Sequence, residues 1–507
     1  MSKSNKLTAV LAAFAVLRMM YIVWGPFGIS PDEAHYWEWS RRLDFSYYSK
    51  GPAVAYVIAF FTSVFGSTEF GIRIGAVFFS TAASYLIYLI GRDLFGSETA
   101  GFRAAVLTNI TPIFSIGAIL MTTDVMFLTF WAATVWAVKR AVDTKSGLWW
   151  YLCGLFIGLG FLSKYTMVLV YPCIALFLLS SRNERVWFLR KEPYIGALVS
   201  LAAATPVIYW NITHGQVTIK HTMGQAHVGS GTLSVGPLFE FIGSQALLLT
   251  PLIFIGLVYG LFRCGTIGFR ADKSGLKLAF FASAPLFLFF LFKGLHGKVQ
   301  ANWAVASYMT AFPAGVWALE ELYGKCSGAG KKVLKGTVLL AAYTGAIASF
   351  FAYFPWTLEP LGAERIMDGP PYNRVTGWKE LGGKISAVKD EMDSAGKTFI
   401  MSDTYQITSE LALYTKGNPV TYNAYTGSRR MNQYDLWPGF EDLLGYNAIY
   451  VKGGDASADA VVEAAFDRCD KELYTVYRSG GRALKSFTIW RCYGFKGMAP
   501  IDGYSKY

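Results

Sequence analysis

The chain has 507 residues, of which 53% are hydrophobic and only 16% are charged, and its mean hydropathy is +0.34. This composition is too apolar for a soluble globular protein of that length and is typical of an integral membrane protein. The formal net charge of +12 therefore reflects membrane topology rather than nucleic-acid binding, which would require a basic face on a soluble domain.

Apolar stretches recur along residues 1–354, and each approaches the roughly 20 residues that a helix needs to cross the hydrocarbon core. The first stretch is longer than a usual signal-peptide core, and "WGP" at 24–26 is a poor cleavage site, which favours a retained span. Glycines and Lys164 divide the stretch 148–180 into two spans. The sequence predicts about eleven transmembrane helices, at 6–24, 70–91, 102–121, 124–141, 148–163, 165–180, 193–211, 236–262, 277–293, 301–319 and 334–354.

Basic residues give the expected orientation, because short loops rich in Lys and Arg stay on the cytoplasmic side. With the N-terminus inside, alternate loops place their basic residues on that same side, among them Lys3, Lys6, Arg92, Arg103, Lys139, Arg140, Arg182, Arg185, Lys273, Lys331 and Lys332. An odd number of spans then exports the C-terminus. We expect a multi-pass protein of the cytoplasmic (inner) membrane with a cytoplasmic N-terminus and a periplasmic C-terminal domain.

The first outer loop, residues 25–69, contains the stretch "ISPDEAHYWEWSRRLDFSYYSKGP" at 29–52. A structural interpretation is that Ser30 to Glu33 form a capping box and that the aromatic residues after it lie at the membrane interface. The box explains Glu33, but it does not require Asp32. A functional interpretation is that an acid, aromatic residues and Lys50 at headgroup level act on a lipid-linked sugar.

Sugar transfer from a polyprenyl phosphate needs few groups, because the donor carries its own leaving group. A carboxylate takes the proton from the acceptor hydroxyl, and cations stabilise the departing phosphate. No nucleotide is needed, and the chain has no Asp-x-Asp pair. The sequence "GAGKK" at 328–332 lacks the spacing and the terminal Ser or Thr of a P-loop.

Three later features are further site candidates, each with a structural alternative. Asp124 follows "MTT" and either faces the site or supports the start of the next span. Lys164 either contributes a cation or extends from a hairpin to the membrane surface. The segment "KGLHGKVQANW" at 293–303 places His296 and Lys298 in an outer loop, either at a phosphate or as interfacial anchors.

Histidines do not indicate a metal site in this sequence. His214, His221 and His227 share a large outer loop, but their spacing is not that of zinc ligands. The six cysteines also lack metal-type spacing. We predict no protein metal site, and the sequence leaves open whether a divalent cation assists the reaction.

Residues 355–507 are richer in Pro, Gly and charge, and we predict that they form a separate exported α/β domain. Strands are expected at 398–403 and 447–454, with a helix at 404–415 between them. Cys469 and Cys492 are the pair in this domain that an oxidising compartment would allow to form a disulfide. The run "RRMNQYDLW" at 429–437 is expected in a loop that contacts the acceptor or the lipid headgroups, or that simply lies at the surface.

Several motifs occur together in an order that resembles the bacterial GT-C glycosyltransferases. They are "PDEAHYWEWS", "LDFSYYSKGP", "MTTD" at 121–124, "GFLSKY" at 160–165 and "HGKVQANW" at 296–303. This group includes protein O-mannosyltransferases and the aminoarabinose transferase of lipid A. The resemblance implies a helical membrane domain, residues 1–354, followed by the exported α/β domain, residues 355–507.

The resemblance also implies roles for individual residues. Asp32 corresponds to the loop-one acid that acts as general base or orients the acceptor, with Glu33 beside it, and Asp124 matches a second outer-face acid. Tyr36, Tyr47 and Lys50 match positions around the donor phosphate in the lipid A enzyme. That enzyme has an acid before its lysine and two prolines after it, whereas this chain has Ser49 and "GP" at 51–52, so the sugar contacted there is expected to differ.

We therefore predict an inverting glycosyltransferase that moves a sugar from a polyprenyl-phosphate donor to a lipid, glycan or protein acceptor on the outer face of the membrane. Asp32 is the expected base, and Lys50, His296 and Lys298 are expected to receive the phosphate. Two other functions remain open at this point. A polytopic transporter or flippase would place ionisable residues at mid-membrane on several spans, and an assembly protein would use its spans only as an anchor.

Overall fold

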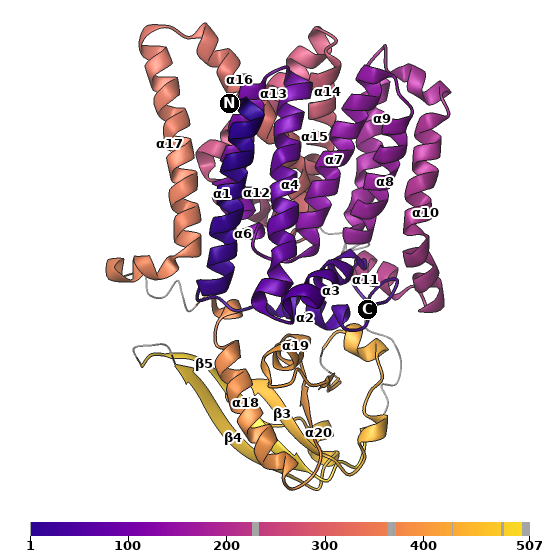
Figure 1. Cartoon of the computed structure of the whole chain (residues 1–507), viewed down its shortest axis with the longest axis vertical. Helices are drawn as coiled ribbons and strands as arrows, with labels where there is room; N and C mark the ends of the chain where they lie inside the picture. Colours follow the sequence, from indigo (N-terminus) through magenta and orange to yellow (C-terminus); the bar gives the residue numbers. More distant parts are fainter. Residues whose placement is uncertain are drawn as a thin grey trace.

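The computed structural model describes residues 2–225, 233–362, 369, 372–427, 429–477 and 481–498. A bundle of long, roughly parallel helices forms one end of the molecule, and a small sheet domain forms the other (Figure 1). Two short helices, α2 (Pro31–Ser40) and α3 (Ala53–Phe65), lie between these two parts. This arrangement confirms the predicted class, a polytopic helical membrane protein with a C-terminal α/β domain.

Seven helical segments of the described residues are long and apolar enough to cross a membrane. They are α1 (Lys3–Trp24), α4 (Glu69–Phe95), α7 (Thr123–Thr144), α10 (Glu192–Thr213), α13 (Pro251–Arg270), the segment Ser274–Gly294 and α17 (Gly328–Tyr353). Four further apolar helices are shorter, at Ala53–Phe65, Leu148–Ser163, Tyr165–Ser180 and Gly236–Leu249. The predicted number of crossings therefore stays a prediction.

Prolines divide three of the predicted spans, which is a correction to the expected continuous helices. The stretch 102–121 consists of α5 (Glu98–Asn109) and α6 (Pro112–Gly117). The stretch 236–262 consists of α12 (Gly236–Leu249) and α13, with Thr250 between them at φ 67°. The stretch 277–293 consists of α14 (Ser274–Phe281) and α15 (Ala284–Gly294). A proline lacks the N–H that continues a helix and disfavours helical geometry in the preceding residue, whereas hydropathy alone does not register it.

The predicted division of 148–180 is confirmed. Helix α8 (Leu148–Ser163) ends at Lys164, whose backbone is extended, and a 3-10 turn (η1, Tyr165–Leu169) leads into α9 (Val170–Ser180). Helices α8 and α10 touch through their backbones, because a Cβ on Gly154 would lie only 1.9 Å from the carbonyl oxygen of Gly196. This close contact holds α8, the helix that ends at Lys164, against α10.

The C-terminal domain has a five-stranded mixed sheet with strand order β2-β1-β3-β5-β4. Strand β1 (Thr398–Ser402) pairs in parallel with β2 (Thr421–Asn423) and β3 (Asn447–Gly453), whereas β5 (Ala483–Tyr493) is antiparallel to β3 and β4 (Arg468–Tyr477). Helices α18 (Trp378–Asp393) and α19 (Tyr405–Tyr414) pack their apolar residues on the sheet. The expected strands and the helix between them are confirmed.

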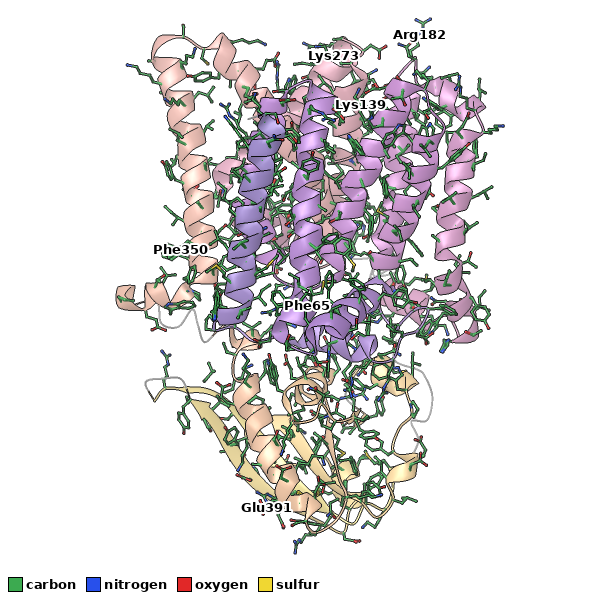
Figure 2. All side chains as sticks on the ribbon, in the orientation of Figure 1. Phe65, Lys139, Arg182, Lys273, Phe350 and Glu391 are labelled. Carbon is green, nitrogen blue, oxygen red and sulfur yellow. A yellow bond between two sulfur atoms is a disulfide. The ribbon has the colours of Figure 1, made fainter. Side chains whose placement is uncertain are left out.

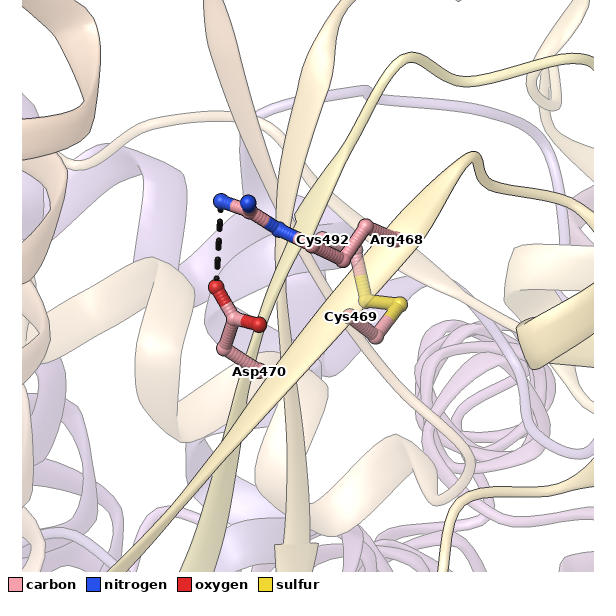
Figure 3. The surroundings of a disulfide bond; sticks show 4 residues. All are labelled: Arg468, Cys469, Asp470 and Cys492. Carbon is pink, nitrogen blue, oxygen red and sulfur yellow. Dashed lines mark ion pairs between the residues drawn. A yellow bond between two sulfur atoms is a disulfide. The ribbon is translucent and has the colours of Figure 1, made fainter.

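A disulfide joins Cys469 of β4 to Cys492 of β5 (Figure 3). The two residues are direct cross-strand partners in the β4–β5 ladder, and Arg468 and Asp470 form an ion pair beside them at 3.2 Å. The bond therefore fixes the register of the two strands at this edge of the sheet.

Charged residues mark the two ends of the molecule. Lys139, Arg182 and Lys273 all lie at the end of the bundle away from the sheet domain, whereas Glu391 lies at the far end of that domain (Figure 2). The basic loops that set the predicted orientation thus share one side.

Candidate functional site

A cavity of about 720 Å³ lies where the bundle meets the sheet domain. From the membrane part it is lined by α2, residues 48–50, the start of α7, Lys164, α11 (Val217–Gln225) and residues 298–303. From the C-terminal domain it is lined by residues 404–406 and 429–433. Residues that are more than 350 positions apart in the sequence therefore face one volume, for example Asp32 and Tyr405.

Most of the predicted site residues meet in this cavity. Asp32, Tyr36, Lys50, Asp124, Lys164 and Lys298 all line it. The first loop supplies Asp32, Tyr36 and Lys50, while Asp124 and Lys164 come from the ends of neighbouring helices that face the sheet domain. The cavity thus brings acidic and basic groups together at the end of the bundle next to the sheet domain.

Asp32 is the second residue of α2, and its side chain is 42% exposed. The hydroxyl of Tyr405 donates a hydrogen bond to its Oδ1 at 2.9 Å, and Nη2 of Arg374 lies 3.3 Å from its Oδ2. Both partners belong to the C-terminal part of the chain. The carboxylate is therefore held in place yet remains accessible from the cavity.

Asp124 and Lys164 form an ion pair at the wall of the cavity. Nδ2 of Asn302 donates a second hydrogen bond to Asp124, at 2.7 Å from Oδ2. Asp124 also lies in the first turn of α7, where Thr122 accepts a hydrogen bond from its backbone N–H at 3.3 Å. Asp124 thus lines the cavity and also lies in the first turn of α7, and Lys164 is buried in the cavity wall.

Lys50 is the lysine of the first loop, and among the described residues its ammonium has no ion-pair partner. Desolvation by the surrounding protein lowers the pKa of Lys50, and repulsion from Lys164 lowers it further, while Asp124 and Asp32 act in the opposite direction. His221 is close enough to Lys50 that the lysine helps burial to lower the pKa of His221 to about 4. A cation that lacks a partner in a desolvated cavity favours binding of an anion.

Tyr36 lies on the side of α2 that is close to the carboxylates of Asp32 and Asp124. Burial raises the pKa of Tyr36 well above its ordinary value, and the negative charges of Asp32 and Asp124 raise it further. Its hydroxyl therefore stays protonated and can donate a hydrogen bond to a ligand oxygen.

Glu33 lies outside the cavity, which corrects the expectation that it acts beside Asp32 in catalysis. Its side chain is completely buried, and Arg73 donates to both carboxylate oxygens at 2.9 and 2.7 Å. The backbone N–H groups of Ser30 and Met121 donate to the same carboxylate. Burial alone would raise the pKa of Glu33, but the Arg73 charge and these hydrogen bonds hold it below its usual value. Glu33 therefore anchors α2.

Tyr47 and His296 also do not line the cavity. The Tyr47 ring is buried and stacks on Trp39 at 4.4 Å, and its hydroxyl lies 3.0 Å from the Trp39 carbonyl oxygen. The His296 ring packs against Phe292 at 4.7 Å, and its Nδ1 lies 3.1 Å from the Phe292 carbonyl oxygen. Both contacts are local, so the predicted phosphate-binding roles have no geometric support here. Lys298 does line the cavity and pairs with Glu240 at 2.8 Å.

Other residues of the cavity were not predicted as site residues. His35 lies within the motif "PDEAHYWEWS", and Asn302 lies within the motif "HGKVQANW". The loop 429–437 was left undecided, and it contributes Arg429, Arg430 and Gln433. Arg429 is fixed by a bidentate ion pair with Asp435 at 2.6 and 2.8 Å. Local sequence gives no signal for Tyr405, because its role depends on domain packing.

His35 is a buried, neutral histidine at the wall of the cavity. Burial lowers the pKa of His35 to about 3, and Nε1 of Trp39 donates to its Nε2 at 3.2 Å. The neutral ring then carries its proton on Nδ1, which has no hydrogen-bond partner among the described residues. This N–H is available as a donor.

A second cavity, of about 540 Å³, is mostly apolar and adjoins the first. It lies between η1, α10, α11 and α15 and includes Phe161, Val168, Val207, Ile208 and Phe290. The two cavities share Ser49, Lys50, Lys164 and Trp303. Lys293 also lines the second cavity. An apolar cavity that shares two lysines with a polar one fits an isoprenoid chain with a phosphate at its end.

Within the described residues, no cluster of three or more His, Cys, Asp and Glu side chains could hold a metal ion. His227 lies outside the described residues. His214 stacks on Trp210 at 4.0 Å and does not line the cavity.

The known proteins to which this chain is similar are glycosyltransferases. Residues 49–210 match the family model for dolichyl-phosphate-mannose-protein mannosyltransferases. The chain is 30% identical over 414 residues to a lipid A galacturonosyltransferase from Rhizobium johnstonii, with 81% of this chain and 82% of that relative covered. It is 25% identical over 367 residues to an undecaprenyl phosphate-α-4-amino-4-deoxy-L-arabinose arabinosyl transferase from Erwinia tasmaniensis, with 66% of this chain and 63% of that relative covered.

Solved structures show the same fold. ArnT from Cupriavidus metallidurans bound to undecaprenyl phosphate matches with a TM-score of 0.65 and 15% identity, over 95% of this chain and 97% of that one. The apo oligosaccharyltransferase of Archaeoglobus fulgidus matches with a TM-score of 0.55 and 12% identity, over 88% of this chain and 69% of that one.

Proposed function

The chain belongs to the GT-C glycosyltransferase family that contains the lipid A galacturonosyltransferases and aminoarabinose transferases, and we propose that Asp32 and Lys50 carry its reaction. It is an integral-membrane enzyme that transfers a sugar from a polyprenyl-phosphate donor to a lipid, glycan or protein acceptor. The observation that supports the proposal is that one cavity holds an accessible carboxylate, a lysine with no ion-pair partner among the described residues, and the end of an apolar groove.

The donor lies with its isoprenoid chain in the apolar groove and its phosphate beside Lys50 and Lys164. These lysines line both cavities, so a lipid in the groove brings its phosphate to them. The anomeric carbon then projects into the polar cavity, toward Asp32. Tyr36 donates a hydrogen bond within the same volume.

The transfer is a single displacement. The Asp32 carboxylate accepts the proton of the acceptor hydroxyl, and the oxygen attacks the anomeric carbon from the face opposite the phosphate. The bond from this carbon to the phosphate oxygen breaks, and the lipid phosphate leaves with one additional negative charge. Lys50 and Lys164 stabilise that charge in a site that excludes bulk water. This mechanism inverts the anomeric configuration.

The charges around the sugar favour a donor that carries a carboxylate. Among the described residues, Lys164, Lys298 and Arg429 are paired with acids, whereas Lys50 and Arg430 are not. One of these two cations suits the phosphate and the other suits an anionic sugar. The curated relatives include a galacturonosyl and an aminoarabinosyl transferase, and the cavity of this chain fits the former better.

The reaction takes place at the outer face of the inner membrane. The N-terminus is cytoplasmic, residues 1–354 form the membrane catalytic domain, and residues 355–507 form a periplasmic domain. The basic residues at the opposite end of the bundle support this orientation, and the Cys469–Cys492 disulfide suits an oxidising compartment. The lipid A substrate of the relative from Rhizobium johnstonii suggests a lipid acceptor at that face.

The test is sugar transfer by the purified full-length protein from synthetic polyprenyl-phosphate sugars, including a uronosyl, a neutral and an amino-sugar donor, with and without EDTA. We expect Asp32→Asn to lower kcat by about 100-fold or more, because it removes the base. Binding of the donor should persist in this variant.

Glu69→Gln is the matched control for Asp32→Asn. Glu69 also accepts a tyrosine hydrogen bond, from Tyr414 at 2.6 Å, and pairs with Lys379 at 2.9 Å, but it does not line the cavity. Equal losses in the two variants would contradict a base at Asp32. Absence of turnover with every donor in the wild-type protein would contradict the proposed function itself.

A further inference from the structure

The C-terminal domain presents the carboxyl ends of two parallel strands to the cavity. Strand β1 ends at Ser402, and Thr404, Tyr405 and Gln406 line the cavity immediately after it. Strand β2 ends at Asn423, and the loop after it contributes residues 429–433. In open α/β sheets, ligands bind beyond the carboxyl ends of parallel strands. The edge of the sheet that faces the cavity is therefore the edge at which such sheets bind their ligands.

Tyr405 reaches from this edge to the candidate base. It is the first residue of α19, and its hydroxyl donates to Oδ1 of Asp32 at 2.9 Å. Burial and the charge of Asp32 raise the pKa of Tyr405, so the hydroxyl keeps its proton and remains a donor. Arg374 approaches the other oxygen, Oδ2, at 3.3 Å, but its side chain is 49% exposed, so water screens its charge.

The position of Tyr405 is itself fixed by packing. Its ring lies 4.8 Å from the ring of His35, one helical turn from Asp32 on α2. The hydroxyl of Ser409, one turn further along α19, lies 3.3 Å from the carbonyl oxygen of Pro31. Ala412 belongs to the same buried cluster as α2 residues. Helices α19 and α2 are therefore held in register, and the Tyr405 hydroxyl has little freedom relative to Asp32.

We propose that Tyr405 is a positioning residue for the glycosyl transfer, because its hydroxyl holds Oδ1 of Asp32 and so fixes the orientation of the carboxylate in the cavity. This inference rests on the proposed function, in which Asp32 is the base. A carboxylate in the first turn of a short helix rotates freely unless a second group holds it, and correct orientation of a base contributes directly to the rate. The C-terminal domain thereby forms part of the active site.

The experiment compares Tyr405→Phe with Tyr414→Phe in the full-length protein. Tyr414 is the last residue of the same helix, and its hydroxyl also bonds across the domain interface, to Glu69 at 2.6 Å and from the Ile29 N–H at 2.8 Å. Each variant thus loses one interfacial tyrosine hydroxyl, but only Tyr405 touches Asp32. Thermal unfolding of both variants measures the structural cost that they share.

In Tyr405→Phe we expect kcat to fall by about 10-fold while KM for the donor is unchanged, because the lost bond acts on the base rather than on donor binding. A loss that appears in kcat and not in KM separates a positioning role from a contact with the donor. Tyr414→Phe should keep the wild-type kcat and KM.

An unchanged kcat in Tyr405→Phe, or the same change of kcat in both variants, would overturn the inference while sugar transfer by the wild-type protein kept the proposed function intact. Loss of donor binding in Tyr405→Phe would also overturn it, because that result would make Tyr405 a donor ligand. Absence of transfer by the wild-type protein would count against the proposed function instead.

Discussion

Two neighbouring carboxylates in the first turn of α2 have separate tasks. Asp32 faces the cavity and remains accessible, whereas Glu33 points into the protein and is fully buried against Arg73. Adjacent helix positions point about 100° apart, so one acid faces the substrate and the next faces the scaffold. The capping box explains Glu33 and leaves Asp32 free for chemistry.

Lys50 carries a prediction about the basic limb of the activity profile. Its pKa is lowered by burial and by Lys164, so its charge is lost at a lower pH than that of an ordinary lysine. Activity should therefore fall as the pH rises through this lowered pKa. In Lys50→Arg the guanidinium stays charged, and we expect the basic limb of the kcat profile to move to higher pH. Lys50→Met should lower kcat by about 100-fold at neutral pH.

The control for Lys50 is Lys379→Met, which removes an exposed lysine that pairs with Glu69 outside the cavity. Its kcat profile should superpose on that of the wild-type protein. A Lys50→Arg profile with an unmoved basic limb would show that another group controls activity at high pH.

At the scale of elements, α2 is the short helix on which the site depends. It carries Asp32, His35 and Tyr36, yet it is only 10 residues long and lies between the bundle and the sheet domain. A helix of this length does not persist alone in water. Its position is therefore fixed from both sides, by Arg73 of α4 and by the packing of α19.

We expect Arg73→Gln to destabilise the protein by about 3–5 kcal/mol, because it leaves the buried Glu33 carboxylate without its partner. Thermal and chemical unfolding in detergent measure the loss. The double variant Glu33→Gln, Arg73→Gln should recover part of it, since no buried charge remains. Equal stability of the single and double variants would contradict the assignment of Glu33 to a buried ion pair.

The sequence predicted those elements whose signal is local. The apolar spans, the capping box of α2, the hairpin at Lys164 and the strands β1 and β3 all follow from hydropathy, capping and turn rules. The divided helices at Pro112 and Pro251 were missed because hydropathy averages over a proline. Tyr405 could not be predicted, because its contact with Asp32 depends on how two domains pack, and no local pattern encodes that distance.

On the scale of the whole molecule, both domains line the candidate site. The membrane part supplies Asp32, Asp124 and the lysines, and the sheet domain supplies Tyr405 and the loop 429–433. We therefore expect the interface between α19 and α2 to control both the stability of the assembly and the geometry of the proposed base. A change in that interface should act on the two together.

Glu410 of α19 is a buried titratable group in this interface. Its side chain is almost inaccessible, and neither carboxylate oxygen has a hydrogen-bond partner among the described residues. Burial raises the pKa of Glu410 well above its ordinary value, and the negative charges of Glu33 and Glu69 raise it further. The positive charges of Lys485 and Arg73 lower the pKa in part. The folded protein therefore keeps Glu410 protonated at a pH where the unfolded chain ionises it.

This difference costs stability as the pH rises. Below the pKa that Glu410 has in the unfolded chain, both states hold the proton and the free energy of unfolding is unaffected. Above that pKa the unfolded chain releases the proton, which lowers the free energy of unfolding until Glu410 also ionises in the folded protein. Glu410→Gln is nearly isosteric and carries no such cost, so we expect it to raise the melting temperature, with a gain that grows as the pH rises from the usual pKa range of a glutamate toward neutrality. The exposed Glu463→Gln on α20 (Ala460–Ala464) is the control and should give no pH-dependent gain.

A constant difference between Glu410→Gln and the wild-type protein across this range would mean that Glu410 is already ionised in the interface. If the gain appears and sugar transfer stays at the wild-type rate, the buried acid tunes the strength of the domain contact without entering the chemistry.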